Sequence, residues 1–198
     1  MRAFKHDYQN ILSSFEAYFE DGDYEQLKAY YYGKVKRVSD DLLAHDFKLE
    51  QLNRLKILEL KSIFANKLML AGSLGVDFTF ELKEDITAID AETVVLVRSI
   101  GIMLDNAIEA VSALGSGLVR IALFQEGKTL SLIIENDCME GLPKIHQLKQ
   151  AGFSTKGEGR GLGLSNLSGF VSQSPHLNLE TTAQNGKFTQ RLLISQGG

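Results

Sequence analysis

The sequence predicts an α+β fold in which an N-terminal helical hairpin precedes an α/β sandwich. The first part of the chain repeats its apolar residues at intervals of three and four, as helices do. The rest mixes helical patterns with alternating segments that pair around short turns. A chain of 198 residues that is 44% hydrophobic can enclose one ordinary core and carry a helical appendage. We place the boundary where the heptad pattern loses its register, which gives residues 1–55 to the hairpin and 56–198 to the sandwich.

The first helix of the hairpin is predicted over residues 1–20. Its apolar stripe consists of Phe4, Tyr8, Ile11, Leu12, Phe15, Tyr18 and Phe19. Residues 21–23 read Asp-Gly-Asp and break this helix. Asp23 and Gln26 have the spacing of a capping box, which marks the start of the next helix.

The second helix carries a heptad seam of apolar residues from Tyr24 to Leu52. Two helices joined by a tight turn cannot enclose a core by themselves. We therefore expect a second copy of the chain to complete a four-helix bundle, so that the protein is a homodimer.

The sandwich is predicted to begin with a helix whose apolar face starts at Leu60 and whose C-terminal stop is Gly75. Val76–Leu82 alternates as a strand, and Asp90 is expected to cap a helix that runs to about Leu114. Most neighbouring strands should be antiparallel. The remaining predicted elements are a hairpin of Leu118–Phe124 and Thr129–Glu135 around Glu126-Gly127, a helix over Gly161–Ser172, and a hairpin of Leu177–Thr182 and Lys187–Ile194 around Asn185-Gly186.

Composition excludes several classes of protein. The net charge of −4 gives no reason to expect a nucleic-acid partner, because phosphate backbones require a basic surface. The single cysteine, Cys138, excludes an intramolecular disulfide and a cysteine-based zinc finger. We find neither a membrane-spanning run nor a secretory signal. The chain opens inside a helical pattern without a cap, so we expect it to be a piece of a longer protein.

A nucleophile is predicted on the first helix. His6 falls away from the apolar stripe and is expected to face solvent. A neutral imidazole is nucleophilic near neutral pH, which makes His6 a candidate phosphate acceptor. Asp7 can orient the ring or take its proton. Asn10 lies one turn further along the same face, where it can position a water molecule.

Two later segments predict a nucleotide site. Asn106 lies on the long helix, where its side-chain oxygen can complete a Mg²⁺ shell shared with phosphates. Glycines at positions 157, 159, 161 and 163 lead directly into a helix, so backbone N–H groups can approach phosphate oxygens. Lys156 or Arg160 can add a positive charge. The glycine pattern is neither a Walker A loop nor a Rossmann fingerprint.

The run HDYQN, then DNAIEA, then FSTKGEGRGLGLSNL resembles the sensor histidine kinases. More narrowly, it resembles the peptide-pheromone quorum-sensing receptors of Gram-positive bacteria, the Agr and Com type. The likeness covers essentially the whole chain. It implies a GHKL-type ATP-binding sandwich, the cofactors ATP and Mg²⁺, and a response regulator as partner. It also implies that the chain is the cytoplasmic part of a cell-membrane receptor whose sensor region lies upstream.

The resemblance also implies a role for each matching residue. His6 would be the phosphorylated histidine, Asp7 its acid–base neighbour, and Asn10 the residue tied to dephosphorylation of the response regulator. Asn106 would bind magnesium. The ATP-binding set would be Asn106, Asn136, Asp137, Phe153, Lys156, Gly159, Arg160, Gly161, Gly163 and Leu164.

The sequence departs from the family pattern in two places. The adenine-binding box, usually Asp-x-Gly-x-Gly, reads ENDCMEG over residues 135–141. The alternation of side chains along the strand aligns Asn136 with the family's adenine-binding aspartate. Counting back from the Leu-Pro at 142–143 aligns Asp137 with it instead. In the motif that contains the magnesium-binding Asn106, the family usually has another asparagine four residues earlier, and this position is Ile102 here.

Ile102 also separates classes of reaction. Related ATPases such as gyrase and MutL carry a glutamate at this position to activate the hydrolytic water, which isoleucine cannot do. The sequence therefore favours phosphoryl transfer to His6. The alternatives are a phosphorelay protein or pseudokinase that does not bind ATP, and an ATP-hydrolysing clamp of the gyrase type.

Overall fold

The structure is a computed structural model, and it describes residues 13, 16–32, 51–141, 143, 145 and 163–197. The chain divides into two compact units, Met1–His45 and Asp46–Gly198, and each is described by itself. No helix in the described part of the chain is both long enough and apolar enough to span a membrane.

The described part of the first unit is the tip of a helical hairpin. Residues 16–20 are helical, and after a turn α2 spans Tyr24–Tyr30. The backbone N–H of Gln26 donates to Asp23 Oδ1 at 3.0 Å, so Asp23 is the N-cap that the sequence predicts. The ring centroids of Tyr18 and Tyr30 lie 5.7 Å apart, which packs the two helices together just beyond the turn.

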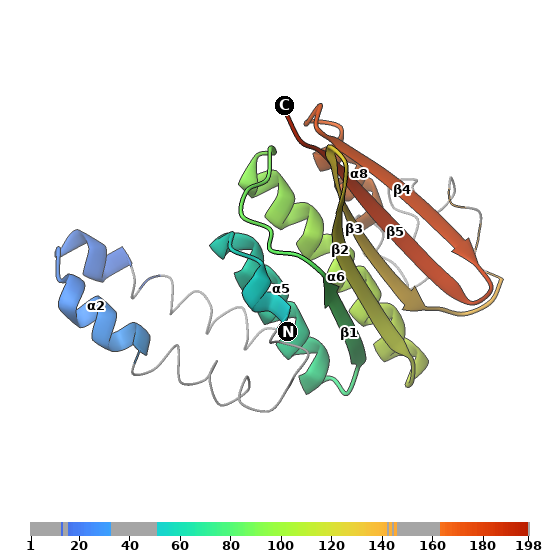
Figure 1. Cartoon of the computed structure of the whole chain (residues 1–198). Coiled ribbons are helices and arrows are strands. Elements are labelled where there is room, and N and C mark those ends of the chain that lie inside the picture. Colours follow the sequence, from blue (N-terminus) through green and yellow to red (C-terminus); the bar gives the residue numbers. More distant parts are fainter. Residues whose placement is uncertain are drawn as a thin grey trace. The chain divides into compact units, whose positions relative to one another are not determined.

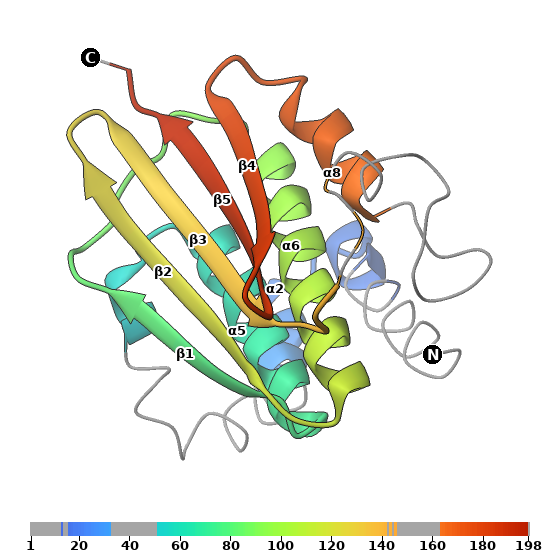
Figure 2. The ribbon, with the colours of Figure 1, turned by 90° about the vertical axis from the view of Figure 1, so that its right-hand side faces the viewer.

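The second unit is a five-stranded sheet with helices on one face (Figures 1 and 2). Its strands follow the order β1-β2-β3-β5-β4, in which β1 and β2 are parallel and the other neighbours are antiparallel. This arrangement confirms the predicted α/β sandwich. The elements are η2 (Gln51–Arg54), α5 (Leu58–Ser73), β1 (Asp77–Leu82), α6 (Thr93–Leu114), β2 (Leu118–Glu126), β3 (Thr129–Asp137), α8 (Gly163–Val171), β4 (Leu177–Gln184) and β5 (Lys187–Ser195).

The core lies between the sheet and α5, α6 and α8. On α6 the residues predicted to point inward, namely Leu96, Ile100, Met103, Leu104 and Ala107, are all at most 2% exposed. On β3 the even-numbered residues Leu130, Leu132, Ile134 and Asn136 are buried beneath the helices. Because side chains alternate along a strand, the odd-numbered residues of β3 lie on the opposite face of the sheet.

The second hairpin of the sheet has the predicted turn, and the first is shifted by one residue. Asn185 and Gly186 have φ angles of 52° and 69°, which is the backbone that a two-residue type I′ turn requires. In the first hairpin Glu126 still pairs with Thr129, so the loop is Gly127-Lys128 instead of Glu126-Gly127.

Gly75 ends α5 as predicted. It has φ 68°, Val76 N–H donates to Ala71 O at 2.9 Å, and Gly75 N–H donates to Gly72 O at 3.1 Å. These two bonds form a Schellman motif, which satisfies carbonyls at the helix end.

The prediction that Asp90 caps α6 is wrong. The N-cap is Glu92, two residues later. The carboxylate of Asp90 instead accepts from the backbone N–H of Gly197 at 2.6 Å, and the side-chain oxygen of Gln196 accepts from Asp90 N–H at 3.2 Å. Asp90 therefore fastens the C-terminal segment, a long-range bond that no local pattern reports.

The assignment of Leu52 to the heptad seam is also wrong. Leu52 lies in η2, is 2% exposed and belongs to the core of the second unit. The side-chain oxygen of Gln51 accepts from Leu82 N–H at 2.8 Å, and Leu55 forms a parallel bridge with Ile86. These contacts attach the segment to the end of β1, and heptad spacing alone cannot reveal them. The division into functional domains at residues 1–55 and 56–198 stays a prediction.

Candidate functional site

Five of the residues predicted to bind ATP lie in the described part of the chain. These are Asn106, Asn136, Asp137, Gly163 and Leu164. The predicted residues His6, Asp7, Asn10, Phe153, Lys156, Gly159, Arg160 and Gly161 lie outside the described residues.

Asn106 and Gly163 are in direct contact. A Cβ atom added to Gly163 would lie 2.9 Å from Asn106 Oδ1, closer than real Cβ contacts allow. Gly163 is the first residue of α8, so the N-terminal end of α8 rests on the side chain of Asn106. The side-chain nitrogen of Asn106 is buried and has no hydrogen-bond partner among the described residues. An unpaired buried N–H donor is costly in a folded protein, and it marks the nitrogen of Asn106 as available to an acceptor on a ligand.

Asp105, the residue before Asn106, forms an ion pair with α5. Lys67 of α5 lies 2.6 Å from Asp105 Oδ1, so Asp105 ties α6 to α5. On the α8 side, the guanidinium of Arg98 lies 5.4 Å from the ring centroid of Phe170. These two contacts join α6 to α5 and to α8.

Asn136 lies on the helix-covered face of the sheet. It is 2% exposed, and its side-chain nitrogen donates to the backbone carbonyl of Asp137 at 2.9 Å. Since the nitrogen is occupied in this way, the side-chain oxygen of Asn136 is the group available to an incoming donor. No donor from the described residues bonds that oxygen.

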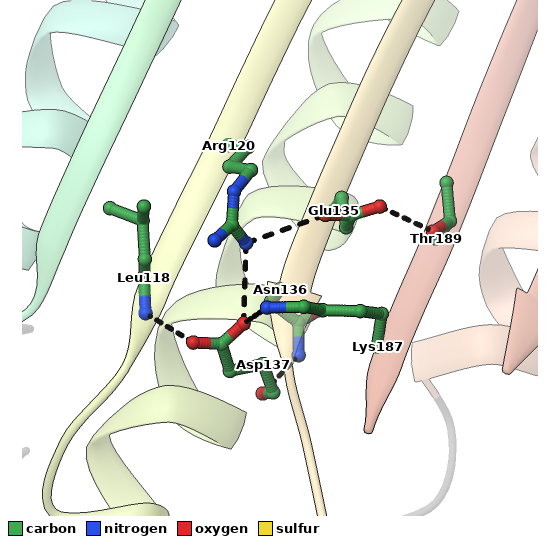
Figure 3. A network of polar contacts seen from close by, with 7 residues as sticks. All are labelled: Leu118, Arg120, Glu135, Asn136, Asp137, Lys187 and Thr189. Atoms are coloured by element: carbon green, nitrogen blue, oxygen red, sulfur yellow. Dashed lines mark hydrogen bonds and ion pairs between the residues drawn. The ribbon is translucent and has the colours of Figure 1, made fainter. Parts of the chain in front are cut away.

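Asp137 lies on the opposite face of the sheet, in a network of charges (Figure 3). Its carboxylate accepts from the Lys187 ammonium, from the Arg120 guanidinium at 3.2 Å and from Leu118 N–H at 3.0 Å. The Lys187 hydrogen bond is the main reason why the pKa of Asp137 is lowered, although burial opposes it. Glu135 extends the network by accepting from Arg120 at 3.3 Å. All the bonds described for the carboxylate of Asp137 therefore join β3 to β2 and β5.

Two further polar side chains lie on the same face as Asn136, and the sequence analysis did not identify them. Gln190 of β5 is 2% exposed, and no described residue forms a hydrogen bond with its side-chain nitrogen. Thr181 of β4 pairs with Gln190 across the strands, and its buried hydroxyl likewise lacks a partner in the described part of the chain. The signal was present, because Gln190 interrupts an apolar alternation that includes Phe188, Leu192 and Ile194.

The described residues fit magnesium bound together with a nucleotide. They contain no group of three or more His, Cys, Asp or Glu side chains able to enclose a metal. The amide oxygen of Asn106 is a hard ligand of the kind that Mg²⁺ accepts. Because Mg²⁺ keeps several waters and binds substrate phosphates, one protein oxygen is a sufficient contribution.

Comparison with known proteins agrees with this geometry. The sequence profile of the GHKL domain matches residues 91–195. The chain is 26% identical over 182 residues to the sensor protein CitS of Bacillus subtilis (strain 168), a match that covers 87% of this chain. The chain spans 31% of the length of CitS.

Histidine kinases are among the solved structures that the chain resembles. The catalytic domain of histidine kinase ThkA, in a nucleotide-free form, has a TM-score of 0.61 and 19% identity, over 71% of this chain and 93% of that chain. The Acinetobacter baumannii histidine kinase AdeS has a TM-score of 0.54 and 14% identity, over 98% of each chain. ThkA in complex with response regulator protein TrrA has a TM-score of 0.56 and 15% identity, over 99% of this chain and 60% of that chain.

At these identities the structural likeness concerns the fold, which is that of histidine kinase catalytic domains. The profile match is stronger, because it spans more than half of the 198 residues and contains Asn106, Asn136 and Gly163. The chain belongs to the GHKL domain family.

Proposed function

We propose that the chain is the catalytic part of a histidine autokinase of a two-component system. In this reaction the bond between the γ-phosphorus of ATP and the β–γ bridging oxygen breaks, and a bond from phosphorus to an imidazole nitrogen of His6 forms. ADP leaves with the bridging oxygen. The phosphoryl group then passes from His6 to an aspartate of a response regulator. The observation that carries the proposal is the side chain of Asn106, whose oxygen lies against the first residue of α8 and whose buried nitrogen has no partner among the described residues.

The nucleotide would lie between α6, α8 and the sheet. Asn106 would offer its side-chain oxygen to Mg²⁺, which supplies charge neutralisation at the phosphates when bound. The backbone N–H groups of the first turn of α8 would donate to phosphate oxygens. The residues that the resemblance adds to this set are Phe153, Lys156, Gly159, Arg160, Gly161 and Leu164.

Asn136 is proposed as the adenine contact in place of Asp137. The side chain of Asn136 lies on the face that carries α6 and α8, whereas the carboxylate of Asp137 is engaged by Lys187 and Arg120 on the other face. The side-chain oxygen of Asn136 can accept from an exocyclic amino group, as the adenine base offers.

On the acceptor side, His6 would attack the γ-phosphorus with its neutral ring nitrogen. Asp7 would take the proton that the ring releases and stabilise the positive charge that develops on it. Asn10, one helical turn away, would position the water that removes the phosphoryl group from the response regulator.

Two features favour transfer over hydrolysis. Ile102 lies on α6, one turn before Asn106, and its side chain cannot serve as the general base that activates a water. The likeness to sensor protein CitS and the fold shared with ThkA and AdeS support a kinase catalytic domain.

The wider context is proposed from the sequence motifs. We propose a homodimer formed through residues 1–55, a response regulator as partner, and a membrane sensor region upstream that detects a peptide pheromone. The complex of ThkA with response regulator protein TrrA supports the choice of partner. The peptide-sensing class rests on the HDYQN, DNAIEA and FSTKGEGRGLGLSNL segments.

The decisive experiment is incubation with radiolabelled ATP and Mg²⁺, followed by treatment with acid or alkali. We expect a label on the wild-type chain that survives alkali and is lost in acid, as a phosphorylated imidazole is. The label should be absent from His6→Ala and present in His45→Ala, a matched control in the same predicted hairpin. Steady release of phosphate without labelled protein would instead identify a hydrolase, and the absence of any ATP binding would identify a pseudokinase.

A further inference from the structure

Gln190 is a buried polar residue that the fold itself does not explain. It lies in the middle of β5, on the face covered by helices, between the apolar residues Phe188 and Leu192 of the same face. Its side-chain nitrogen has no partner among the described residues, although Thr181 lies at the paired position on the neighbouring strand. An unsatisfied buried amide destabilises the folded protein, so a compensating ligand is the simplest reason for keeping it.

The C-terminal end of α6 and the end of β3, where Asn136 lies, are at the same height along the sheet. A Cβ added to Gly117, in the link between α6 and β2, would lie 3.3 Å from Val111 Cγ1 and 3.1 Å from Asp137 Cβ. The last turns of α6 are therefore at the same end of the sheet as the end of β3.

Gln190 then lies at about the level of Asn106. Asn106 precedes Val111 by five residues, which is roughly 7.5 Å along a helix. Gln190 pairs with Ile134, two residues before Asn136, which is about 6.6 Å along a strand. The side-chain amides of Asn106 on α6 and Gln190 on β5 thus lie at a similar height along the sheet, and the proposed nucleotide site would lie between them.

The available atoms on Asn136 and Gln190 are complementary to one edge of adenine. Asn136 and Gln190 occupy diagonal positions on neighbouring strands, a separation of about 7–8 Å that long side chains can bridge onto one group. The oxygen of Asn136 can accept from the exocyclic amine, and the nitrogen of Gln190 can donate to the adjacent ring nitrogen N1. Guanine reverses both groups, presenting an acceptor to the oxygen and an N–H to the nitrogen.

We propose that Gln190 determines the base specificity of this site by donating a hydrogen bond from its side-chain nitrogen to N1 of adenine. The inference rests on the proposed function, because it requires an adenine nucleotide between α8 and the sheet. Gln190 would be a second side chain, beside Asn136, that recognises the base, and it would make the site selective for adenine over guanine.

The test is a binding cycle on the full chain with ATP and 1-deaza-ATP, which lacks only the ring nitrogen, measured by titration calorimetry in Mg²⁺ buffer. Wild type should bind ATP about tenfold more tightly than 1-deaza-ATP, since the analogue leaves the donor of Gln190 unpaired. Gln190→Leu should bind ATP about tenfold more weakly than wild type and should no longer distinguish the two nucleotides. Thr189→Val, the neighbouring residue on the opposite face, should keep both wild-type affinities.

The outcomes separate the two proposals. Equal affinity of wild type for ATP and 1-deaza-ATP would overturn the role of Gln190 without recourse to any variant, and so would a Gln190→Leu protein that still discriminates. In either case ATP binding itself would stand. Failure of wild type to bind ATP at all would overturn the proposed function, and the role of Gln190 with it.

Discussion

Gly163 is the residue at which the absence of a side chain matters most. Its Cα atom faces Asn106 so closely that a methyl group would lie 2.9 Å from the amide oxygen. The atom in the way is the far end of a side chain, so the side chain of Asn106 can rotate aside. The contact therefore constrains the orientation of Asn106 more than it constrains the fold.

We predict that Gly163→Ala separates binding from stability. The free energy of unfolding should change by less than about 1 kcal/mol, since the gain in helix propensity offsets the displacement. ATP affinity should fall about tenfold or more, because the displaced oxygen no longer faces the magnesium position. Urea unfolding and calorimetric titration with ATP measure the two quantities.

Gly169→Ala is the matched control within α8. A Cβ at Gly169 meets nothing within 4 Å, so this change should raise stability by about 0.5–1 kcal/mol and leave ATP affinity unaltered. Unchanged ATP affinity in Gly163→Ala would contradict the placement of the nucleotide against Asn106.

Among the elements, the outer face of the sheet depends on Asp137. This carboxylate, on β3, binds Arg120 of β2 and Lys187 of β5, and it joins the three strands at the edge of the sheet where β3 ends and where β2 and β5 begin. Its pKa is lowered in the folded protein, chiefly by the Lys187 hydrogen bond. Its contribution to stability is therefore complete above the ordinary value of 3.8 and is lost as the pH falls through the lowered value.

We predict that Asp137→Asn removes part of the acid sensitivity of the fold. The free energy of unfolding of wild type should decrease as the pH is lowered from about 5 toward 2, with a slope set by proton uptake at Asp137. Asp137→Asn should be less stable than wild type at pH 7 and should show a flatter dependence below pH 4. Urea denaturation at successive pH values measures this, and Lys187→Met should flatten the profile in the same way. Parallel profiles for the three proteins would exclude Asp137 as the titrating group.

The elements were predictable where local chemistry decides them. Asn185-Gly186 fixes the second hairpin, Asp23 starts α2 and Gly75 ends α5, each through bonds to near neighbours. The exceptions, Asp90 and Leu52, depend on contacts with distant residues. The bond from Gly197 to Asp90 spans 107 positions, and nothing in a window of a few residues announces it.

At the scale of the whole molecule, we predict that self-association belongs to the N-terminal unit. The full chain should form dimers whose fraction rises with concentration, because two helices need a partner to bury their apolar stripes. A chain of residues 46–198, the second compact unit, should be monomeric and should retain ATP affinity. Analytical ultracentrifugation and calorimetry test both statements. A monomeric full chain at all concentrations, or a dimeric 46–198 chain, would contradict the prediction.

The candidate site was only partly accessible to sequence reasoning. The order of the motifs predicted Asn106 and Gly163 as parts of one site, and their contact in the structure brings them together. The sequence left Asn136 and Asp137 as alternatives, because the end of a strand does not show which residue faces the helices. The pairing register places the two residues on opposite faces of the sheet. Gln190 could be identified only from the structure, because what marks it is a buried side-chain nitrogen without a hydrogen-bond partner among the described residues.

The pairing of Asp137 with Lys187 has a consequence for the chain that connects β3 to β5. The two residues are 50 positions apart, yet they are direct partners in the sheet, so everything between them leaves the end of β3 and returns to it. The entropy lost by closing such a loop grows only logarithmically with its length, and doubling that length costs about 0.6 kcal/mol. The glycine-rich segment of residues 153–163, which the resemblance assigns to ATP binding, can therefore lengthen or shorten during evolution at little cost to the sheet.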